Sequence, residues 1–359
     1  LTGRIGGQTV GFLNVVTAKA GDVPRTSYSV ARMKRDVGEN NFLGWMVTDR
    51  RDPDGSNTVA ALDGSFWLRP TLNVKGFYSR SFTSGPGGED DVYSATIDYS
   101  TYLIGASFQH LTVGREAQAD IGFITRGDIR QTGADLRFSP RPGIAGLRVI
   151  NTRLDAEYVS TVDGRMQDWT AGLWVGPNFD SGESIGMRLE VGESRLDEGF
   201  DLADSIRVDP GLFDLVQARL FLETSPHRAL VGELRGTWEA FYGGDLYSVE
   251  TSISASPTPQ IILEAAHNWN RAEMPNGACT ANITSLRLGY SFSTRLTTNA
   301  LIQYNSLYED FSANVRLNFI HRPGSDLFIV LTERRGVDGS LWDLSDRGLV
   351  AKVTYLVRL

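Results

Sequence analysis

The stretch FSANVRLNF (residues 311–319) alternates apolar and polar side chains along its whole length. Its odd-numbered residues are apolar and its even-numbered residues are polar, with Arg316 near the centre. In a soluble sandwich the apolar face of such a strand points to the core. In an outer-membrane barrel the apolar face meets lipid, and the polar face lines a hydrated lumen. The stretch therefore predicts a strand. Features elsewhere in the chain are needed to distinguish a soluble sandwich from an outer-membrane barrel.

Alternating runs of this kind recur from one end of the chain to the other, whereas helical periodicity is almost absent. Many runs exceed about nine residues, although strands of soluble sheets usually have about five or six. The greater length suits a tilted strand that crosses a bilayer. The clearest runs are residues 130–139, 147–160, 184–193, 215–223, 230–242, 246–256, 285–293, 297–305, 311–319 and 349–359.

Composition and charge narrow the classes of function. The chain has 359 residues, of which 41% are hydrophobic and 38 are glycine, as in a folded and turn-rich protein. The net charge of −8 is spread along the sequence without a basic block, so no nucleic-acid partner is predicted. No stretch approaches the roughly 20 consecutive apolar residues of a spanning helix, which leaves a β-barrel as the membrane option.

The links between the runs alternate in length, which is a more specific signal. Short periplasmic turns that alternate with long outer loops are typical of bacterial outer-membrane barrels. The short links are residues 69–71, 100–102, 180–183, 225–228, 258–260 and 293–295. The long links are 19–27, 50–57, 83–91, 112–128, 198–211, 274–280 and 336–348, with short exceptions at 162–164, 243–245 and 308–310.

These patterns predict an all-β fold: a transmembrane antiparallel up-and-down β-barrel of about 20–22 strands in the bacterial outer membrane. Residues 1–359 are expected to form a single barrel, since no shift in composition marks a second domain. We count about 21 strands, and bacterial barrels have an even number. At least one strand or an N-terminal domain is therefore expected before Leu1 in the full-length protein.

The polar faces of the runs predict which side chains line the lumen. Both signs of charge are interleaved there, so cross-strand ion pairs that hold a hydrated wall together are favoured, with a selectivity filter or ligand site as the alternative. Leu189, Leu234, Val315 and Leu317 are expected to face lipid. A similar inward set is Asn151, Arg153, Asp155 and Glu157. The main lumen-facing candidates are Arg188, Glu190, Arg219, Glu233, Arg235, Glu239, Arg287, Arg316, Lys352 and Arg358.

The chain ends in the amphipathic run LVAKVTYLVRL (residues 349–359). Val353, Tyr355, Val357 and Leu359 form its apolar face, and the run resembles the terminal signal that the barrel-assembly machinery of Gram-negative bacteria reads. Leu359 stands where phenylalanine is common. The predicted partners therefore include this machinery and outer-membrane lipid.

Four motifs together resemble a known family. They are residues 23–37 (VPRTSYSVARMKRDV), 122–143 (GFITRGDIRQTGADLRFSPRPG), 321–333 (HRPGSDLFIVLTE) and 349–359. The chain resembles, along essentially its whole length, the C-terminal barrel of the bacterial proteins called domain of unknown function 5916. Members commonly carry an N-terminal carbohydrate-binding domain similar to family nine, which these residues do not include. The resemblance implies an outer-membrane barrel from a Gram-negative source and transfers no activity.

Enzyme motifs are not found, so no catalytic residue, cofactor or metal site is predicted. The four histidines are far apart in sequence, and neither a zinc-protease motif nor a serine nucleophile elbow occurs. The stretch DPDGSN (52–57) resembles a calcium loop, but a solvated turn is favoured. An outer-membrane hydrolase is the less favoured alternative.

Two functions stay open on the sequence alone. A barrel of 20–22 strands has a lumen too wide for its own side chains to fill, and barrels of that size are usually plugged. The longest links, 112–128 and 198–212, are expected only to narrow it. The sequence therefore predicts a channel or conduit subunit of a larger outer-membrane assembly, with a protein partner or an N-terminal domain filling or capping the lumen. The alternative is a barrel that anchors a surface or periplasmic domain.

Overall fold

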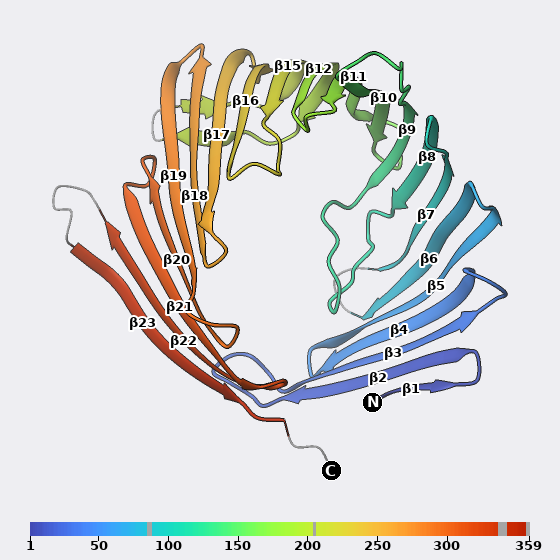
Figure 1. The fold of residues 1–359 in the computed structure, drawn as a ribbon. Coiled ribbons are helices and arrows are strands. Elements are labelled where there is room, and N and C mark those ends of the chain that lie inside the picture. Colours follow the sequence, from blue (N-terminus) through green and yellow to red (C-terminus); the bar gives the residue numbers. More distant parts are fainter. Residues whose placement is uncertain (85–87, 204–205, 337–342, 357–359) are drawn as a thin grey trace. The chain divides into compact units, whose positions relative to one another are not determined.

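The structure, a computed structural model, describes residues 1–84, 88–203, 206–336 and 343–356. It is all-β, with 21 strands in one large antiparallel sheet and two strands in a small one (Figure 1). The strands are β1 (Thr2–Ile5), β2 (Gln8–Thr17), β3 (Thr26–Asp36), β4 (Phe42–Asp52), β5 (Gly55–Arg69), β6 (Leu72–Ser84), β7 (Glu89–Ser100), β8 (Ile104–Val113), β9 (Ile129–Phe138), β10 (Leu147–Ser160), β11 (Met166–Phe179), β12 (Ser184–Leu196), β13 (Phe200–Ala203), β14 (Ile206–Val208), β15 (Gly211–Glu223), β16 (Leu230–Phe241), β17 (Gly244–Thr258), β18 (Ile261–Met274), β19 (Gly277–Ser291), β20 (Leu296–Asn305), β21 (Asp310–Arg322), β22 (Ser325–Gly336) and β23 (Asp343–Thr354).

The predicted strand number of about 21 is confirmed for the large sheet, and most predicted runs coincide with strands. Residues 147–160 form β10, and residues 297–305 lie within β20. The final run is shifted, because β23 begins at Asp343 rather than at residue 349. Arg347 pairs with Glu333 across the ladder, with 2.7 Å between Nη2 and Oε2, and this contact extends the strand into residues predicted as a link.

Two links predicted as long, residues 50–57 and 274–280, are wrong. Strand β4 ends at Asp52 and β5 starts at Gly55, while β18 ends at Met274 and β19 starts at Gly277. In the first turn, Asp52 Oδ1 accepts hydrogen bonds from the amides of Asp54 and Gly55, both at 2.9 Å. A carboxylate that closes its own turn lets polar residues occupy a tight hairpin.

The chain divides into two compact units. The first holds β1–β9 with the adjoining parts of β10–β12, and the second holds the other parts of β10–β12 and β13–β23. In the first unit each strand from β1 to β10 pairs antiparallel with the next one in the chain. In the second unit the same holds from β15 to β23. Neighbours in sequence are therefore neighbours in each unit, as in an up-and-down sheet.

Large apolar side chains are mostly exposed on the strands. Leu234 is 42% exposed, Leu189 is 43% exposed and Leu220 is 59% exposed. A continuous exposed apolar face of this extent is a membrane-contacting surface rather than a soluble one. No helix in the described ranges is long and apolar enough to cross a membrane.

The main buried apolar cluster lies in the first unit. It joins Val113, Ile129 and Val159, and residues 114–128, here called the β8–β9 link, pack Ala117 and Ile124 against it. Val113, Ile129 and Val159 lie on one face of the sheet by register, the face that also carries Gln131 and Arg32. The link therefore folds onto this face instead of extending away from it.

The small sheet of β13 and β14 lies within the predicted long link 198–211. Ile206 and Val208 are each only 2% exposed, and Asn276 Nδ2 donates to the carbonyl of Arg207 at 2.9 Å. The hairpin is thus attached to the β18–β19 turn within the second unit. Tyr242, in the β16–β17 turn, adds edge-on ring contacts with Phe200 and Phe213.

Candidate functional site on the polar face

The register places the predicted lumen residues of the second unit on one face. Directly opposed residues of an antiparallel pair share a face, so each ladder transfers the assignment to the next strand. Glu264 lies opposite Arg287, and Arg235 lies opposite Glu250. The face collects Arg219, Glu233, Arg235, Glu239, Arg287, Arg316 and Lys352. Arg188 and Glu190 join it because Ser184, of the same parity on β12, donates to Glu223 at 3.2 Å. That this polar face lines a lumen stays a prediction.

Most of these charges have a cross-strand partner. Arg235 Nη1 lies 2.6 Å from Glu250 Oε2, and Arg287 Nη1 lies 3.2 Å from Glu264 Oε2. Within β12 itself, Arg188 donates through Nε to Glu190 at 3.0 Å. Other contacts are Gln217 to Glu239 at 2.6 Å, Arg219 to Thr237 at 3.1 Å, and Arg316 over the ring of Phe328 at 4.7 Å. Such pairs link neighbouring strands on the polar face.

The predicted assembly signal is only partly described. Val353 and Tyr355 are 74% and 64% exposed, and Arg322 lies over the ring of Tyr355 at 4.5 Å. Val357, Arg358 and Leu359 lie outside the described residues.

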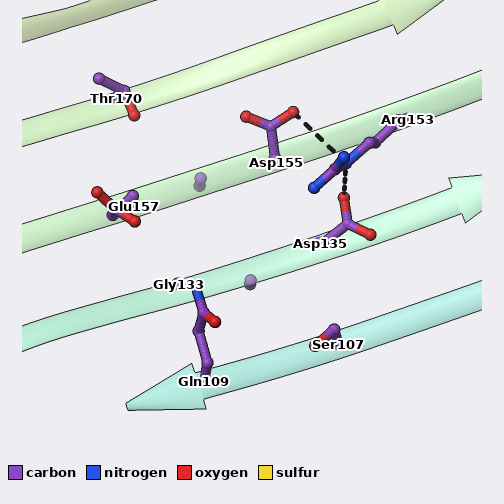
Figure 2. Close-up of a pocket in the computed structure, with 10 residues that line it drawn as sticks. Ser107, Gln109, Gly133, Asp135, Arg153, Asp155, Glu157 and Thr170 are labelled. Atoms are coloured by element: carbon purple, nitrogen blue, oxygen red, sulfur yellow. Dashed lines mark hydrogen bonds and ion pairs between the residues drawn. The ribbon is translucent and has the colours of Figure 1, made fainter. Parts of the chain in front are cut away.

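A charged hollow opens on the polar face of the first unit, across β8–β11 (Figure 2). Its volume is about 270 Å³, and its charged lining consists of Asp135, Arg153, Asp155 and Glu157. Figure 2 shows Arg153 between Asp135 and Asp155, with Nε 4.0 Å from Asp155 Oδ1 and in direct contact with Asp135. Three carboxylates thus share a recess with one guanidinium.

The rim of this charged hollow is polar and hydrogen-bonded. Gln131 Nε2 donates to Glu157 at 2.7 Å, and Ser107 Oγ donates to Asp98 at 2.6 Å. Asp98 also pairs with Lys75 at 3.0 Å. Because the carboxylates outnumber the guanidinium, the hollow favours cations over anions by simple Coulomb attraction.

The β8–β9 link is held in place by hydrogen bonds to strands of the first unit. Asn57, 1% exposed, donates through Nδ2 to the carbonyl of Gln118 at 3.2 Å and accepts from the amide of Asp120 at 3.1 Å. Ser81 Oγ accepts from the amide of Gln118 at 3.3 Å. Toward β11, Arg126 donates to Gln167 and Asp168, both at 2.8 Å.

The link also carries a charge cluster outside the strands. Arg115 contacts Asp163 and lies 3.3 Å from Asp128 through Nε, and the hydrogen bonds that its guanidinium donates to these two carboxylates raise its pKa. Asp128 Oδ1 also accepts from the amide of Val162 at 3.2 Å. The link is therefore tied to the β10–β11 turn as well as to β5–β7.

Sequence reasoning found part of this site and missed part of it. The inward set Arg153, Asp155 and Glu157 was predicted, and the structure brings these three together at the hollow. Asp135, Gln109 and Ser107 were missed, although the alternation of residues 130–139 carries the signal for Asp135. Asn57 is not among the predicted site residues, because it lies in a stretch predicted as a long link.

Two of the four histidines make local hydrogen bonds in the described structure. His110 bonds the hydroxyls of Thr132 at 2.8 Å and Thr112 at 3.1 Å, and His267 bonds Thr284 at 2.8 Å. Among the residues the structure describes, no cluster of three or more His, Cys, Asp or Glu side chains could hold a metal ion.

Taken together, the sheet and its faces define a class: the fold is that of the outer-membrane β-barrel receptors of Gram-negative bacteria. The outer membrane is also the location that the sequence predicts.

Particular solved structures share this fold. The ferric enterobactin receptor of Pseudomonas aeruginosa, in complex with enterobactin, matches with a TM-score of 0.60 and 10% identity, covering 96% of this chain and 72% of that one. The ferric-catecholate import receptor Fiu of E. coli matches at 0.56 and 8%, covering 98% and 74%. The copper transporter OprC matches at 0.53 and 9%, covering 98% and 73%. All three are transport-type barrels.

No known family matches the sequence, and no curated protein does. At these identities the likeness to solved structures concerns the fold alone.

Proposed function

We propose that the chain is the membrane conduit of a larger outer-membrane assembly and passes polar solutes along its polar face. The observation that carries the proposal is the opposition of two continuous faces in the second unit, one apolar and exposed, the other charged and paired. If the apolar face contacts lipid, the charged face on the other side of the sheet is expected to contact water.

The charged hollow on β8–β11 favours transport over a purely anchoring role. Arg153 is 56% exposed there, and the carboxylates around it remain within reach of solutes. A barrel that only anchors another domain gains nothing from a recess of this kind. The names of the structural neighbours, siderophore receptors and a copper transporter, are in line with a transport role.

The proposal also includes a second component, a partner subunit or an N-terminal region that associates with the barrel. The neighbours' chains extend beyond the part that this chain matches, since 72% of the enterobactin receptor is covered. Barrels of about 20–22 strands are usually plugged, so we expect a partner subunit or an N-terminal region to fill or cap the lumen. The resemblance to domain of unknown function 5916 belongs to the same proposal and rests on the four short motifs.

Planar-bilayer recording of the purified chain tests the conduit. We expect a large, steady conductance from the chain alone and a lower one when the partner is added. A silent pore in the purified chain would instead favour the anchor.

The same recording tests the hollow. Replacing Asp155 and Glu157 together by Asn and Gln removes two of its three carboxylates. We expect the reversal potential in a salt gradient to move away from cation preference, whereas Ser107→Ala, at the same hollow, should leave it in place. An equal shift in both variants would show that the hollow does not set selectivity.

A further inference from the structure

The polar face of the first unit contains an apolar patch that the alternation rule does not explain. The register of β4–β7 aligns Met46 with Ala61, Ala61 with Ser79, and Ser79 with Val92 on this face. Val59 and Phe77 lie on the same face in the adjacent rows. In a barrel wall that meets water, these positions are expected to be polar.

The β8–β9 link covers only part of this patch. At one end of the patch, Val92 and the link residues Ala117 and Ile124 pack against the buried cluster of Val113, Ile129 and Val159. Beyond it a hollow of about 450 Å³ remains, with Met46, Val59, Ala61 and Phe77 on the strand side and Ala119 and Phe123 on the link side. Phe123 is 87% exposed, so its ring has little packing of its own.

The hollow is preformed. Gln118, which lines it from the link, is bonded to the buried side chains of Asn57 and Ser81. Asp120, two residues further on, is also bonded to Asn57. A small-molecule site is typically a largely preformed apolar recess of about 300–1,000 Å³ with a few fixed polar groups. The size and lining of this recess agree with that description.

The fixed polar groups are Arg32 and Asp63. Arg32 Nη2 donates to Asp63 Oδ2 at 2.7 Å, and the side chains are 33% and 25% exposed. Because the pair is neutral as a whole, a charged ligand would be attracted by one member and repelled by the other. A hydroxyl suits both members, since it can donate to the carboxylate and accept from the guanidinium.

We infer that this hollow binds a small neutral amphipathic molecule, with an aromatic or aliphatic body against Met46, Val59 and Phe123 and a hydroxyl at the Arg32–Asp63 pair. The inference rests on the proposed function only in requiring that the polar face meets water. The proposed conduit would then bind apolar solutes that carry a hydroxyl at this hollow. The charged hollow on β8–β11, by contrast, favours cations.

Cysteine protection tests the site with 2-naphthol as the probe. Ser79→Cys is made in a Cys279→Ser background, reconstituted in lipid nanodiscs and labelled with a membrane-impermeant maleimide. We expect 2-naphthol to slow labelling along a saturable curve, by about tenfold at ten times the midpoint concentration. The charged analogue naphthalene-2-sulfonate should protect far less.

Matched variants locate the effect. Ser107→Cys, in the charged hollow, reports the same face and should label at an unchanged rate with the probe present. Ala61→Phe fills the apolar hollow and should abolish protection of Ser79→Cys. Phe123→Ala removes an exposed ring, leaves the strands intact and should weaken the protection of Ser79→Cys. This second variant can be measured even if Ala61→Phe does not fold.

The failures of the two proposals are distinguishable. Labelling of Ser79→Cys without protection by 2-naphthol overturns the ligand site and leaves the conduit standing. Protection that persists in Ala61→Phe and in Phe123→Ala shows binding elsewhere and also overturns the site. Absence of labelling at both reporters would show that the face does not meet water, which contradicts the conduit as well.

Discussion

At the residue scale, one asparagine determines where the β8–β9 link lies. Asn57 is buried, and its amide bonds Thr83 at 2.9 Å, the carbonyl of Gln118 at 3.2 Å and the amide of Asp120 at 3.1 Å. An amide can donate and accept at once, so one side chain satisfies two backbone groups of the link and one neighbouring strand. The alternative, an unpaired buried carbonyl or amide, is unfavourable.

Replacing this residue by alanine should release the link. Asn57→Ala leaves buried backbone groups unpaired, at about 1–3 kcal/mol each, so we expect faster amide hydrogen exchange at residues 118–120. Asn14→Ala, which removes the amide that bonds Ser29 at 2.8 Å in the same unit, is the matched control and should leave that exchange unchanged. Unchanged exchange in Asn57→Ala would contradict the anchoring role.

At the element scale, β21 and β22 show how a two-residue period becomes two surfaces. Val315 lies opposite Leu331 and Leu317 opposite Ile329, while Arg316 lies opposite Val330 on the other face. Placing Arg316 at the lipid midplane would cost about 2–4 kcal/mol. The observed register places the apolar side chains on one face and Arg316 on the other. A slip of one strand by one residue would exchange the faces on which its side chains lie.

The two faces should differ in their access to water. In a Cys279→Ser background, Arg316→Cys in the reconstituted barrel should react with a membrane-impermeant maleimide, whereas Leu317→Cys should react only with a lipid-soluble one. Reaction of residue 317 but not of residue 316 with the impermeant reagent would reverse the assignment of the faces.

A turn should confer a local dependence on pH. Hydrogen bonds from Ser181 and from its own backbone amide, together with the charge of Arg228, lower the pKa of Glu183 in the turn between β11 and β12. Because the folded pKa lies below the unfolded value, the carboxylate stabilises the turn above its ordinary pKa, and this support is lost as pH falls through the folded pKa. Near neutral pH we expect amide hydrogen exchange at residues 180–183 to be slower in the unmodified chain than in Glu183→Gln. This difference in exchange rate should close as the pH falls and the carboxyl becomes protonated. A gap that stays constant through the acidic range would disprove the linkage.

At the scale of the whole molecule, stability comes from ladders and lipid rather than from a central core. The described buried apolar residues are few, and most large apolar side chains on the strands remain exposed. Each ladder satisfies the backbone of its neighbour, which a bilayer requires because it offers no water to hydrogen-bond. Contact of the exposed apolar face with lipid therefore contributes to the stability of the fold.

Assembly should depend on the last strand. Val353 and Tyr355 are highly exposed, and we propose that they belong to an apolar signal for barrel assembly. We therefore expect Val353→Asp with Tyr355→Asp to lower the amount of folded, heat-modifiable barrel in the outer membrane. Lys352→Asp, on the opposite face of β23, should have a smaller effect. Equal loss in both variants would indicate a general defect of the strand rather than loss of a signal.

The sequence by itself determined the class of fold, the approximate number of strands in the large sheet, and which side chains of a strand share a face. Side chains of a strand alternate between faces, so a local period of two carries this information without any distant contact. That is why Arg235, Arg287 and Arg316 could be grouped correctly on one face before any pairing was known.

Only the tertiary structure decided the course of the links and the two hollows. The tight turns at Asp52–Gly55 and Met274–Gly277 arise where polar residues close a hairpin, and composition alone cannot tell such a turn from a long loop. The β8–β9 link is positioned by Asn57, which is 61 residues from Gln118 in the sequence, and the charged hollow is assembled from four strands. Contacts over such separations depend on the register of several ladders at once, and no local pattern of residues encodes them.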